Sequence, residues 1–334
     1  MSLVNRFLIA CLVWTLSLFS QTIDYDVVVV GTSPFSLLEA LYQNNIGKKV
    51  LIIEKASECG GSWKSISICG VPHADMGCHY IGSDPQILHF MTEYLGCQMV
   101  SLDNPLDSCR LHPSSSFYPS GGCYEFLGQI LKLIEKTSIR LELNCSLEKV
   151  SIDPLQPIAY IETLEGKIST CKIIYPQYCY FQLADNPHST PPPASSNFLH
   201  LYLLIADPTP PRFSYHSSLG KGISRMMNLT YFANLAETGQ QLIVFQSYQP
   251  LTQQAAEDYL RLLIEHQLVD KSAHLLNFES YVYEQCHHRS PLFPQTPTNL
   301  ALFESLDTRG IQLMSQYIPK WTTALKPYKE AMGE

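Results

Sequence analysis

Four consecutive valines, Val27–Val30, constrain the fold of this chain more than any other feature of its sequence. An unbroken run of apolar, strand-forming residues indicates a strand buried on both faces, as in a parallel sheet covered by helices. The residues around the run predict a strand at 25–30, a tight turn at 31–36, a helix at 37–45 and a second strand at 49–54. These segments form one βαβ unit and predict an α/β fold.

The length and composition of the chain indicate a folded globular protein of two domains. Its 334 residues exceed one ordinary core, and a buried cofactor cleft is feasible at that size. Apolar residues make up 46% and charged residues only 16%, which argues against a disordered chain. The net charge is −8 and no long run of Lys or Arg occurs, so we expect no nucleic-acid partner, because such binding rests on neutralising phosphates.

A Pro- and Ser-rich segment at 186–196 predicts a loop or linker. We predict a first domain of residues 23–180 and 295–334 with the α/β fold, and a smaller α+β substrate domain of residues 181–294. The further predicted helices are 85–95, 124–136, 253–267 and 310–317, and the further predicted strands are 139–143, 159–163, 172–175, 198–205, 242–248 and 278–283. Residues 165 and 166 form the expected hairpin turn between strands 159–163 and 172–175.

Residues 1–22 form a hydrophobic leader. The thirteen residues 7–19 are largely apolar, and no charge occurs from Phe7 through Ile23. This length suits the core of a signal peptide better than a membrane span, which needs about 20 apolar residues. A single-pass membrane anchor and an apolar tail from an upstream start codon are the alternatives. We expect an extracytoplasmic, secretory or membrane-anchored location if the leader functions, and a cytoplasmic one otherwise.

The cysteines do not indicate a metal site. The eleven cysteines include no Cys-x-x-Cys pair and no compact framework, so neither a zinc site nor a disulfide scaffold is expected. Cys286, His287 and His288 form one cluster, which Cys78 and His79 would have to complete. Adjacent residues of one strand point to opposite faces, so we predict no metal there.

The turn after the valine run has most parts of a dinucleotide site. Such a site needs a glycine turn that a diphosphate can approach, a helix N-terminus aimed at the phosphates and an acid for the ribose. Gly31 ends the first strand, the helix starts beyond Pro34, and Glu54 follows Gly31 by 23 residues, near the usual spacing of about 20. Ser33 and Ser36 replace the second and third glycines of the pattern. A βαβ unit that binds no nucleotide is therefore the alternative.

The segments that follow resemble a known family. In order, they are Asp26 to Gly31, Glu54-Lys55, Gly60-Gly61 and the run from Asp75-Met76-Gly77 to Tyr80-Ile81-Gly82. They are similar to the opening of the flavin-dependent amine oxidase superfamily, which includes monoamine and polyamine oxidases, protoporphyrinogen oxidase and UDP-galactopyranose mutase. The resemblance covers about the first 100 residues. It implies an FAD/NAD(P)-binding Rossmann-like domain with FAD as the cofactor.

The resemblance also implies which residues contact the cofactor. In the family, the glycine turn binds the FAD diphosphate, the acid holds the adenosine ribose, and a later glycine segment passes beside the flavin ring. A turn near residue 147 lies by the adenine, and a late acid and glycine lie by the ribityl chain and the flavin pyrimidine. The implied contacts are Gly31, Thr32, Ser33, Ser36, Glu54, Lys55, Gly60, Gly61, Ser62, Gly77, Leu147, Glu304 and Gly310. Ser62 stands where many members have arginine, and no glycine precedes Glu304.

Three functions are compatible with this resemblance. The first is an FAD-dependent oxidoreductase acting on a small-molecule or lipid-like substrate. Its catalytic candidates are His79, which would exchange a proton near neutral pH, and Tyr80; packing roles for both are the alternative interpretation. The second is a non-catalytic binding protein similar to GDP dissociation inhibitors and escort proteins, whose same-fold opening resembles Gly31-Thr32 and residues 47–51. The third is a mutase-like flavoenzyme acting on a sugar nucleotide.

Overall fold

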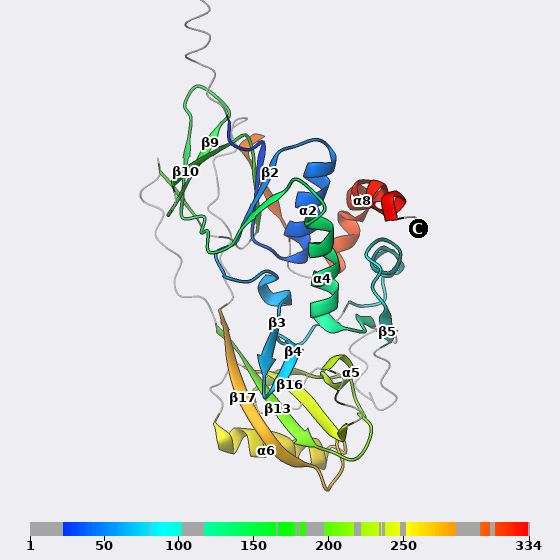
Figure 1. Cartoon of the computed structure of the whole chain (residues 1–334). Helices are drawn as coiled ribbons and strands as arrows, with labels where there is room; N and C mark the ends of the chain where they lie inside the picture. The colour runs from blue at the N-terminus through cyan, green and yellow to red at the C-terminus, as the bar shows by residue number, and fades with distance from the viewer. Residues whose placement is uncertain are drawn as a thin grey trace, which may run out of the picture.

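The structure is a computed structural model in which two lobes are joined along the chain (Figure 1). The first lobe contains a parallel sheet with helices, and the second contains an antiparallel sheet with one long helix. The description covers residues 23–79, 81–101, 117–164, 166–177, 179, 181–184, 197–216, 222–233, 235, 238–247, 252–284, 301–307 and 311–332. The predicted leader 1–22, the segment 186–196, Tyr80, the cluster Cys286 to His288 and Gly310 lie outside these residues.

The valine run forms the central strand of the first lobe. Strand β1 (Val27–Val30) pairs in parallel with β2 (Val50–Ile53) on one side and β11 (Ile173–Pro176) on the other. The sheet is completed by β7 (Arg140–Glu142) beside β2 and β18 (Phe303–Leu306) beside β11. No valine of β1 is more than 7% exposed, so the predicted strand buried on both faces is confirmed.

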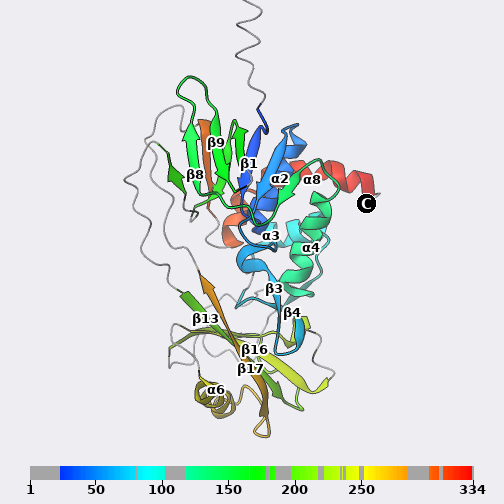
Figure 2. The same cartoon turned by 60° about the vertical axis from the view of Figure 1, so that its left-hand side comes forward.

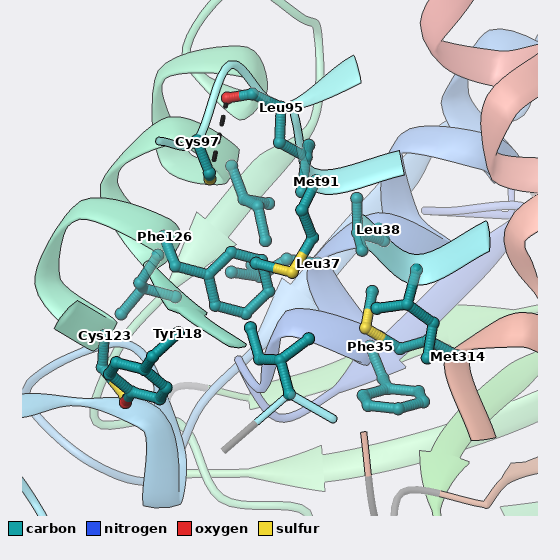
Figure 3. Packing of buried hydrophobic residues seen from close by; sticks show 14 of the residues in the cluster. Phe35, Leu37, Leu38, Met91, Leu95, Cys97, Tyr118, Cys123, Phe126 and Met314 are labelled. Atoms are coloured by element: carbon teal, nitrogen blue, oxygen red, sulfur yellow. Dashed lines mark hydrogen bonds between the residues drawn. The ribbon is translucent and has the colours of Figure 1, made fainter. Parts of the chain in front are cut away.

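Successive valines of β1 serve two different cores, because side chains alternate between the faces of a strand. Val27 and Val29 belong to a core formed with α2 (Pro34–Asn45), α4 (Gly122–Ile134) and α8 (Ile318–Met332). Figure 3 shows part of this core, to which Phe35, Phe126 and Met314 contribute from separate segments. Val28 and Val30 face a second core under a four-stranded sheet of β8 (Lys149–Ile152), β9 (Ala159–Thr163), β10 (Gly166–Thr170) and β12 (Gln182–Leu183) (Figure 2).

Two sequence-based predictions about this region are wrong. The partner of β9 is β10, and the predicted strand 172–175 instead becomes β11 of the parallel sheet. Two nearly adjacent strands therefore enter different sheets, which local periodicity cannot distinguish. The predicted domain boundary at 181 also moves, because β12 pairs with β8 and Phe181 is fully buried in the first lobe.

The second lobe is an antiparallel sheet in the order β14-β15-β16-β13-β17. Its strands are β13 (Asn197–Ala206), β14 (Tyr215–His216), β15 (Ile223–Asn228), β16 (Gln240–Ser247) and β17 (His274–Glu284). One face packs on α6 (Gln253–Glu265), and the other faces the first lobe, where β3 (Ser65–Ile68) and β4 (Val71–Asp75) form a hairpin (Figure 1). The predicted helix 253–267 and the strands near 198–205 and 242–248 are confirmed.

The shorter elements connect these layers. They are η1 (Gly61–Trp63), α3 (Pro85–His89), η2 (Phe90–Tyr94), β5 (Met99–Ser101), β6 (Phe117–Pro119), α5 (Thr230–Ala233) and η4 (Ile311–Gln316). The helix predicted at 310–317 is the short helix η4, and the long helix α8 that follows it was not anticipated. Among the residues described, no helix is both long and apolar enough to cross a bilayer.

The C-terminal helix is held on α2 by a buried carboxylate. Glu39 is fully buried and accepts a hydrogen bond from the indole N–H of Trp321 at 3.2 Å. Lys320 places its ammonium 2.6 Å from the same carboxylate, and the amide of Gln43 donates to it at 2.9 Å. The Trp321 ring itself is fully buried and meets the Phe35 ring edge-on at 5.7 Å between centroids. The last helix is therefore part of the first lobe's core.

Replacing Trp321 by alanine tests this anchoring. The change leaves a large cavity and removes one donor from Glu39, so we expect the free energy of unfolding to fall by about 3–5 kcal/mol. Leu155→Ala, at a position 85% exposed, is the control and should change it by less than about 0.5 kcal/mol. Urea unfolding followed by circular dichroism measures both, and equal midpoints for the two variants would contradict the packing described.

Candidate functional site

The first component of the site is the turn between β1 and α2. Gly31 has φ of +82°, a left-handed conformation that favours glycine, and its N–H donates to the carbonyl of Ile53 at 2.8 Å. A Cβ placed on Gly31 would lie 3.5 Å from Pro176 and 3.8 Å from Ser36, which are ordinary contacts. Backbone conformation rather than lack of space therefore requires glycine here.

The two serines that replace glycines leave part of the helix N-terminus open. Ser33 caps α2, its hydroxyl accepting the N–H of Ser36 at 3.3 Å. The Ser36 hydroxyl donates to the carbonyl of Val30 at 3.2 Å, so it points into the contact between helix and strand. Within the described residues, the backbone N–H groups of Ser33 and Phe35 have no acceptor, and Pro34 has no N–H. These two N–H groups are available to an anion at the start of α2.

Glu54 lies at the end of β2 and is bound by the same turn. Thr32 donates to its Oε2 twice, from the backbone N–H at 2.9 Å and from the hydroxyl at 2.7 Å. The N–H of Ala56 donates to Oε1 at 2.9 Å, and the residue is only 7% exposed. Glu54 is thus beside Gly31, as predicted. Oε1 has one donor and retains a lone pair for a further hydroxyl.

The paired glycines have different roles. Gly60 donates its N–H to the Thr32 hydroxyl at 2.9 Å, and a Cβ on it would lie 2.6 Å from the Leu127 side chain of α4. Gly60 is therefore required for packing within the protein. A Cβ on Gly61 would meet nothing within 4 Å, so its contact with a cofactor stays a prediction, as it does for half-buried Ser62. Lys55 is exposed near the turn.

The segment expected near the adenine lies beside Glu54. The N–H of Glu54 donates to the backbone carbonyl of Glu142 at 2.9 Å, and the N–H of Cys145 donates to the backbone carbonyl of Glu54 at 2.8 Å. Leu147 follows this segment and buries its side chain in the second core, at 6% exposed. A contact of the Leu147 backbone with the cofactor stays a prediction.

The register of the parallel sheet separates Glu304 from the site. Val29 pairs with Ile174, and Ile174 pairs with Glu304, so Glu304 lies at mid-strand in the sheet. Its carboxylate forms ion pairs with Lys172 and Lys320. Asp307 comes directly after β18, at the carboxyl edge where ligands of parallel sheets bind. The family resemblance implies Glu304, and the residues alone do not show that it lies at mid-strand.

The glycine segment predicted beside the flavin ring lies where the two lobes meet. Gly77 has φ of +95°, and a Cβ on it would lie 2.8 Å from the His200 ring of β13. Its N–H donates to the Tyr202 hydroxyl at 2.9 Å, and that hydroxyl donates to the carbonyl of Asp75, also at 2.9 Å. Glycine at this position therefore allows the second lobe to approach closely.

His79 follows in the same segment and packs on an aromatic ring. It stacks on Trp63 with 4.6 Å between ring centroids, and its Nε2 lies 2.9 Å from the carbonyl of Met76. Burial and the charge of Arg225 lower the pKa of His79 to about 4. The ring is therefore neutral at pH 7, unlike the proton-exchanging histidine expected from the sequence. A catalytic role for His79 stays a prediction.

A buried carboxylate lies under this segment. Asp75 is 1% exposed and accepts hydrogen bonds from the Tyr118 hydroxyl at 2.8 Å, the Cys123 N–H at 2.9 Å and the Ser65 hydroxyl at 3.1 Å. Burial raises the pKa of Asp75 to about 6, against the opposing effect of these donors. A Cβ on Gly122 would lie 2.8 Å from this carboxylate. Asp75 thus joins the hairpin to the start of α4.

A comparison with protein families matches part of the first lobe. A family model described as the NAD(P)-binding Rossmann-like domain matches residues 29–94. This segment therefore has a Rossmann-like fold. The match begins in β1 and extends past Gly77, so the Rossmann-like domain includes the glycine turn, Glu54 and the segment at the lobe contact. No curated protein sequence matches the chain.

Solved structures with the same fold cover most of the chain at low identity. The chain is similar to an oxidoreductase from Methanosarcina mazei, with 12% identity, a TM-score of 0.56 and coverage of 87% of this chain and 99% of that one. A reduced UDP-galactopyranose mutase is 12% identical with a TM-score of 0.59, and the match covers 78% of this chain and 83% of that one. A Rab GDI from Plasmodium falciparum is 10% identical with a TM-score of 0.56, and the match covers 91% of this chain and 98% of that one. These similarities confirm the predicted fold class. Since the neighbours differ in function, the Rossmann-like fold alone leaves the activity open.

Three residues near Gly77 were missed or left without a role at the level of sequence: Asp75, His200 and Arg225. His200 and Tyr202 alternate with leucines along β13, which is the period of a strand with one apolar and one mixed face. That alternation is a signal for His200. Arg225 has no such pattern, and only strand pairing places it near the others. Among the residues described, no group of His, Cys, Asp and Glu could hold a metal ion.

The buried Asp75 predicts a specific pH dependence. Its folded pKa of about 6 lies above the ordinary 3.8, so it favours the folded state below pH 4 and loses that contribution as pH rises through 6. His79 and His200, with pKa values lowered to about 4, act oppositely and destabilise the fold on acidification. Asp75→Asn removes the stabilising proton uptake of Asp75 and leaves the destabilising effect of the two histidines. Between pH 6.5 and 4, the free energy of unfolding of this variant should therefore fall more than that of the wild type, by on the order of 3 kcal/mol.

Urea unfolding at several pH values measures this difference. Ser65→Ala, which leaves the carboxylate but removes one donor that lowers the pKa of Asp75, is the comparison and should keep the proton uptake, shifted to a slightly higher pH. Parallel curves for Asp75→Asn and the wild type would show that Asp75 does not take up a proton in the folded chain.

Proposed function

We propose that the chain is an FAD-dependent oxidoreductase of the amine oxidase-like type. The observation that carries the proposal is the start of α2, which we call the niche: the N–H groups of Ser33 and Phe35 have no acceptor in the described part of the chain and lie beside the left-handed Gly31. Glu54 lies at the neighbouring strand end with a lone pair free on Oε1. N–H donors at a helix N-terminus bind a diphosphate, and a carboxylate acceptor binds the hydroxyls of a ribose.

The chain's own residues would divide the work of such an enzyme. Ser33 and Phe35 would hold the diphosphate, Glu54 the ribose, and the segment from Gly77 to His79 would border the flavin. FAD, when bound, supplies the hydride acceptor. Neutral His79, fixed by Trp63 and the carbonyl of Met76, would orient a substrate rather than supply a proton at pH 7. Tyr80 remains the second catalytic candidate, and the substrate would be a small or lipid-like molecule.

One observation favours a second candidate, a non-catalytic binding protein. Glu54 already accepts three hydrogen bonds from Thr32 and Ala56, and Ser33 uses its hydroxyl to cap α2. The turn is therefore stable without any nucleotide. In this alternative the Rossmann-like fold is retained as a scaffold, and the niche has lost its ligand.

The two candidates differ in whether FAD is retained. The purified chain, incubated with FAD and separated from free cofactor, should keep the visible flavin absorbance if the proposal is correct. A folded protein that stays colourless supports the binding protein. If flavin is bound, reduction of its spectrum by amines supports the oxidase, whereas turnover of a UDP-sugar with no electron acceptor consumed supports a mutase.

Substitutions at Ser33 test the niche directly. Ser33→Gly releases the Ser36 N–H for the diphosphate and costs the helix cap only a few tenths of a kcal/mol, so we expect FAD to bind several-fold more tightly. Ser33→Leu fills the niche and should weaken binding at least about tenfold. Ser36→Ala, whose hydroxyl points toward Val30, is the control and should bind FAD like the wild type. Equal FAD affinity in all three variants would remove the niche from the proposal.

A further inference from the structure

Four polar side chains form a line across the second lobe's sheet. Arg225 of β15 pairs with Gln246 of β16, Gln246 pairs with His200 of β13, and His200 pairs with Tyr281 of β17. Residues that pair directly across antiparallel strands project from the same face of the sheet. We call Arg225, Gln246, His200 and Tyr281 the cross-sheet row.

The row lies on the face that meets the first lobe. His200 contacts Gly77, and Tyr202, two residues further along β13, hydrogen-bonds the same glycine. The intervening Leu201 belongs to the core under α6, on the opposite face. The row is therefore next to the segment from Gly77 to His79, which borders the predicted flavin position.

Several hydrogen-bonding groups of the row lack a partner. The Arg225 side chain makes one hydrogen bond in the described part of the chain, from Nε to the Gln246 amide oxygen. Four guanidinium N–H groups remain. His200 is 5% exposed, forms no hydrogen bond with described residues, and buries an unpaired Nδ1. An unpaired buried polar atom destabilises the fold unless a ligand or water satisfies it.

Arg225 carries the positive charge of the row. No carboxylate among the described residues pairs with Arg225, whereas Arg212 in the same lobe pairs with Asp270 at 3.4 Å. Burial, and then the charges of His79 and Arg225, lower the pKa of His200. The Lys64 ammonium lies 5.9 Å from the centroid of the Tyr281 ring. It also forms an ion pair at 3.6 Å with Glu58, whose side chain is exposed. Glu279, on β17, is exposed and accepts the N–H of Cys69.

We propose that the cross-sheet row binds the anionic group, a carboxylate or phosphate, of the substrate. Arg225 supplies the charge and the paired N–H donors, and His200 and Tyr281 supply further hydrogen bonds. The inference rests on the proposed function, because it places that anion beside the segment from Gly77 to His79. It deepens that function by restricting the substrate to anionic molecules.

The test reads the row itself. The full-length chain is labelled with ¹⁵N-histidine, the His200 signals are assigned with His200→Gln, and inorganic phosphate, benzoate and uncharged benzamide are titrated separately. We expect phosphate or benzoate to shift the His200 signals saturably, and the tighter of the two identifies the anion. Benzamide should not shift them. No His200 shift with either anion, or equal shifts with benzamide, would overturn the proposal.

Arginine variants make the test specific. Arg225→Gln should lower the affinity for the anion about 10- to 100-fold, because charge-assisted hydrogen bonds are lost. Arg225→Lys keeps the charge and should retain part of the affinity, and Arg212→Gln should retain all of it. If the affinity of Arg225→Gln for the anion is unchanged, the anion does not bind at Arg225 and the proposal is wrong. If Arg225→Gln does not fold, the comparison of Arg225→Lys with Arg212→Gln decides.

The outcomes separate this inference from the proposed function. FAD retention reports on the niche at α2, and the His200 signals report on the row. A chain that retains FAD but shows no anion-dependent His200 shift overturns the row alone. A colourless chain with a saturable His200 shift overturns the oxidoreductase and keeps an anion site.

Discussion

The Glu54 carboxylate is the interaction on which the arrangement of the first lobe depends. It binds Thr32 through two donors and Ala56 through one, and Thr32 in turn accepts the N–H of Gly60. Two segments, the turn at Thr32 and the chain from Glu54 to Gly60, are thereby fixed to each other at the carboxyl edge of the sheet. Because a nearly buried carboxylate must have donors, loss of any of them would disturb the turn, the strand end and the glycine pair together.

The glycines of the motif serve the protein's own packing as much as a ligand. Gly60 lets the turn pack against Leu127 of α4, and Gly77 lets His200 of the second lobe pack against the backbone. The same residues thus maintain the fold with or without a cofactor. Solved structures of an oxidoreductase and a Rab GDI share the fold of this chain.

The sequence predicted well where local pattern and burial coincide. The valine run, the glycine turn and Glu54 were placed correctly because each lies in one βαβ unit. The pairing of β9, the strand position of Glu304 and the domain boundary at 181 were wrong. Each of these errors concerns which strand pairs with which over long sequence separation, and periodicity carries no information about a partner.

The sequence by itself determined a parallel α/β core and the turn chemistry at Gly31, because burial on both faces and a left-handed backbone restrict which residues are possible. Only the tertiary structure decided that Arg225 and His200 lie in one row, that His79 is neutral at pH 7, and that Asp75 is held under the lobe contact. Charge and pKa depend on which groups approach within a few ångströms, and strands from distant parts of the chain set those distances.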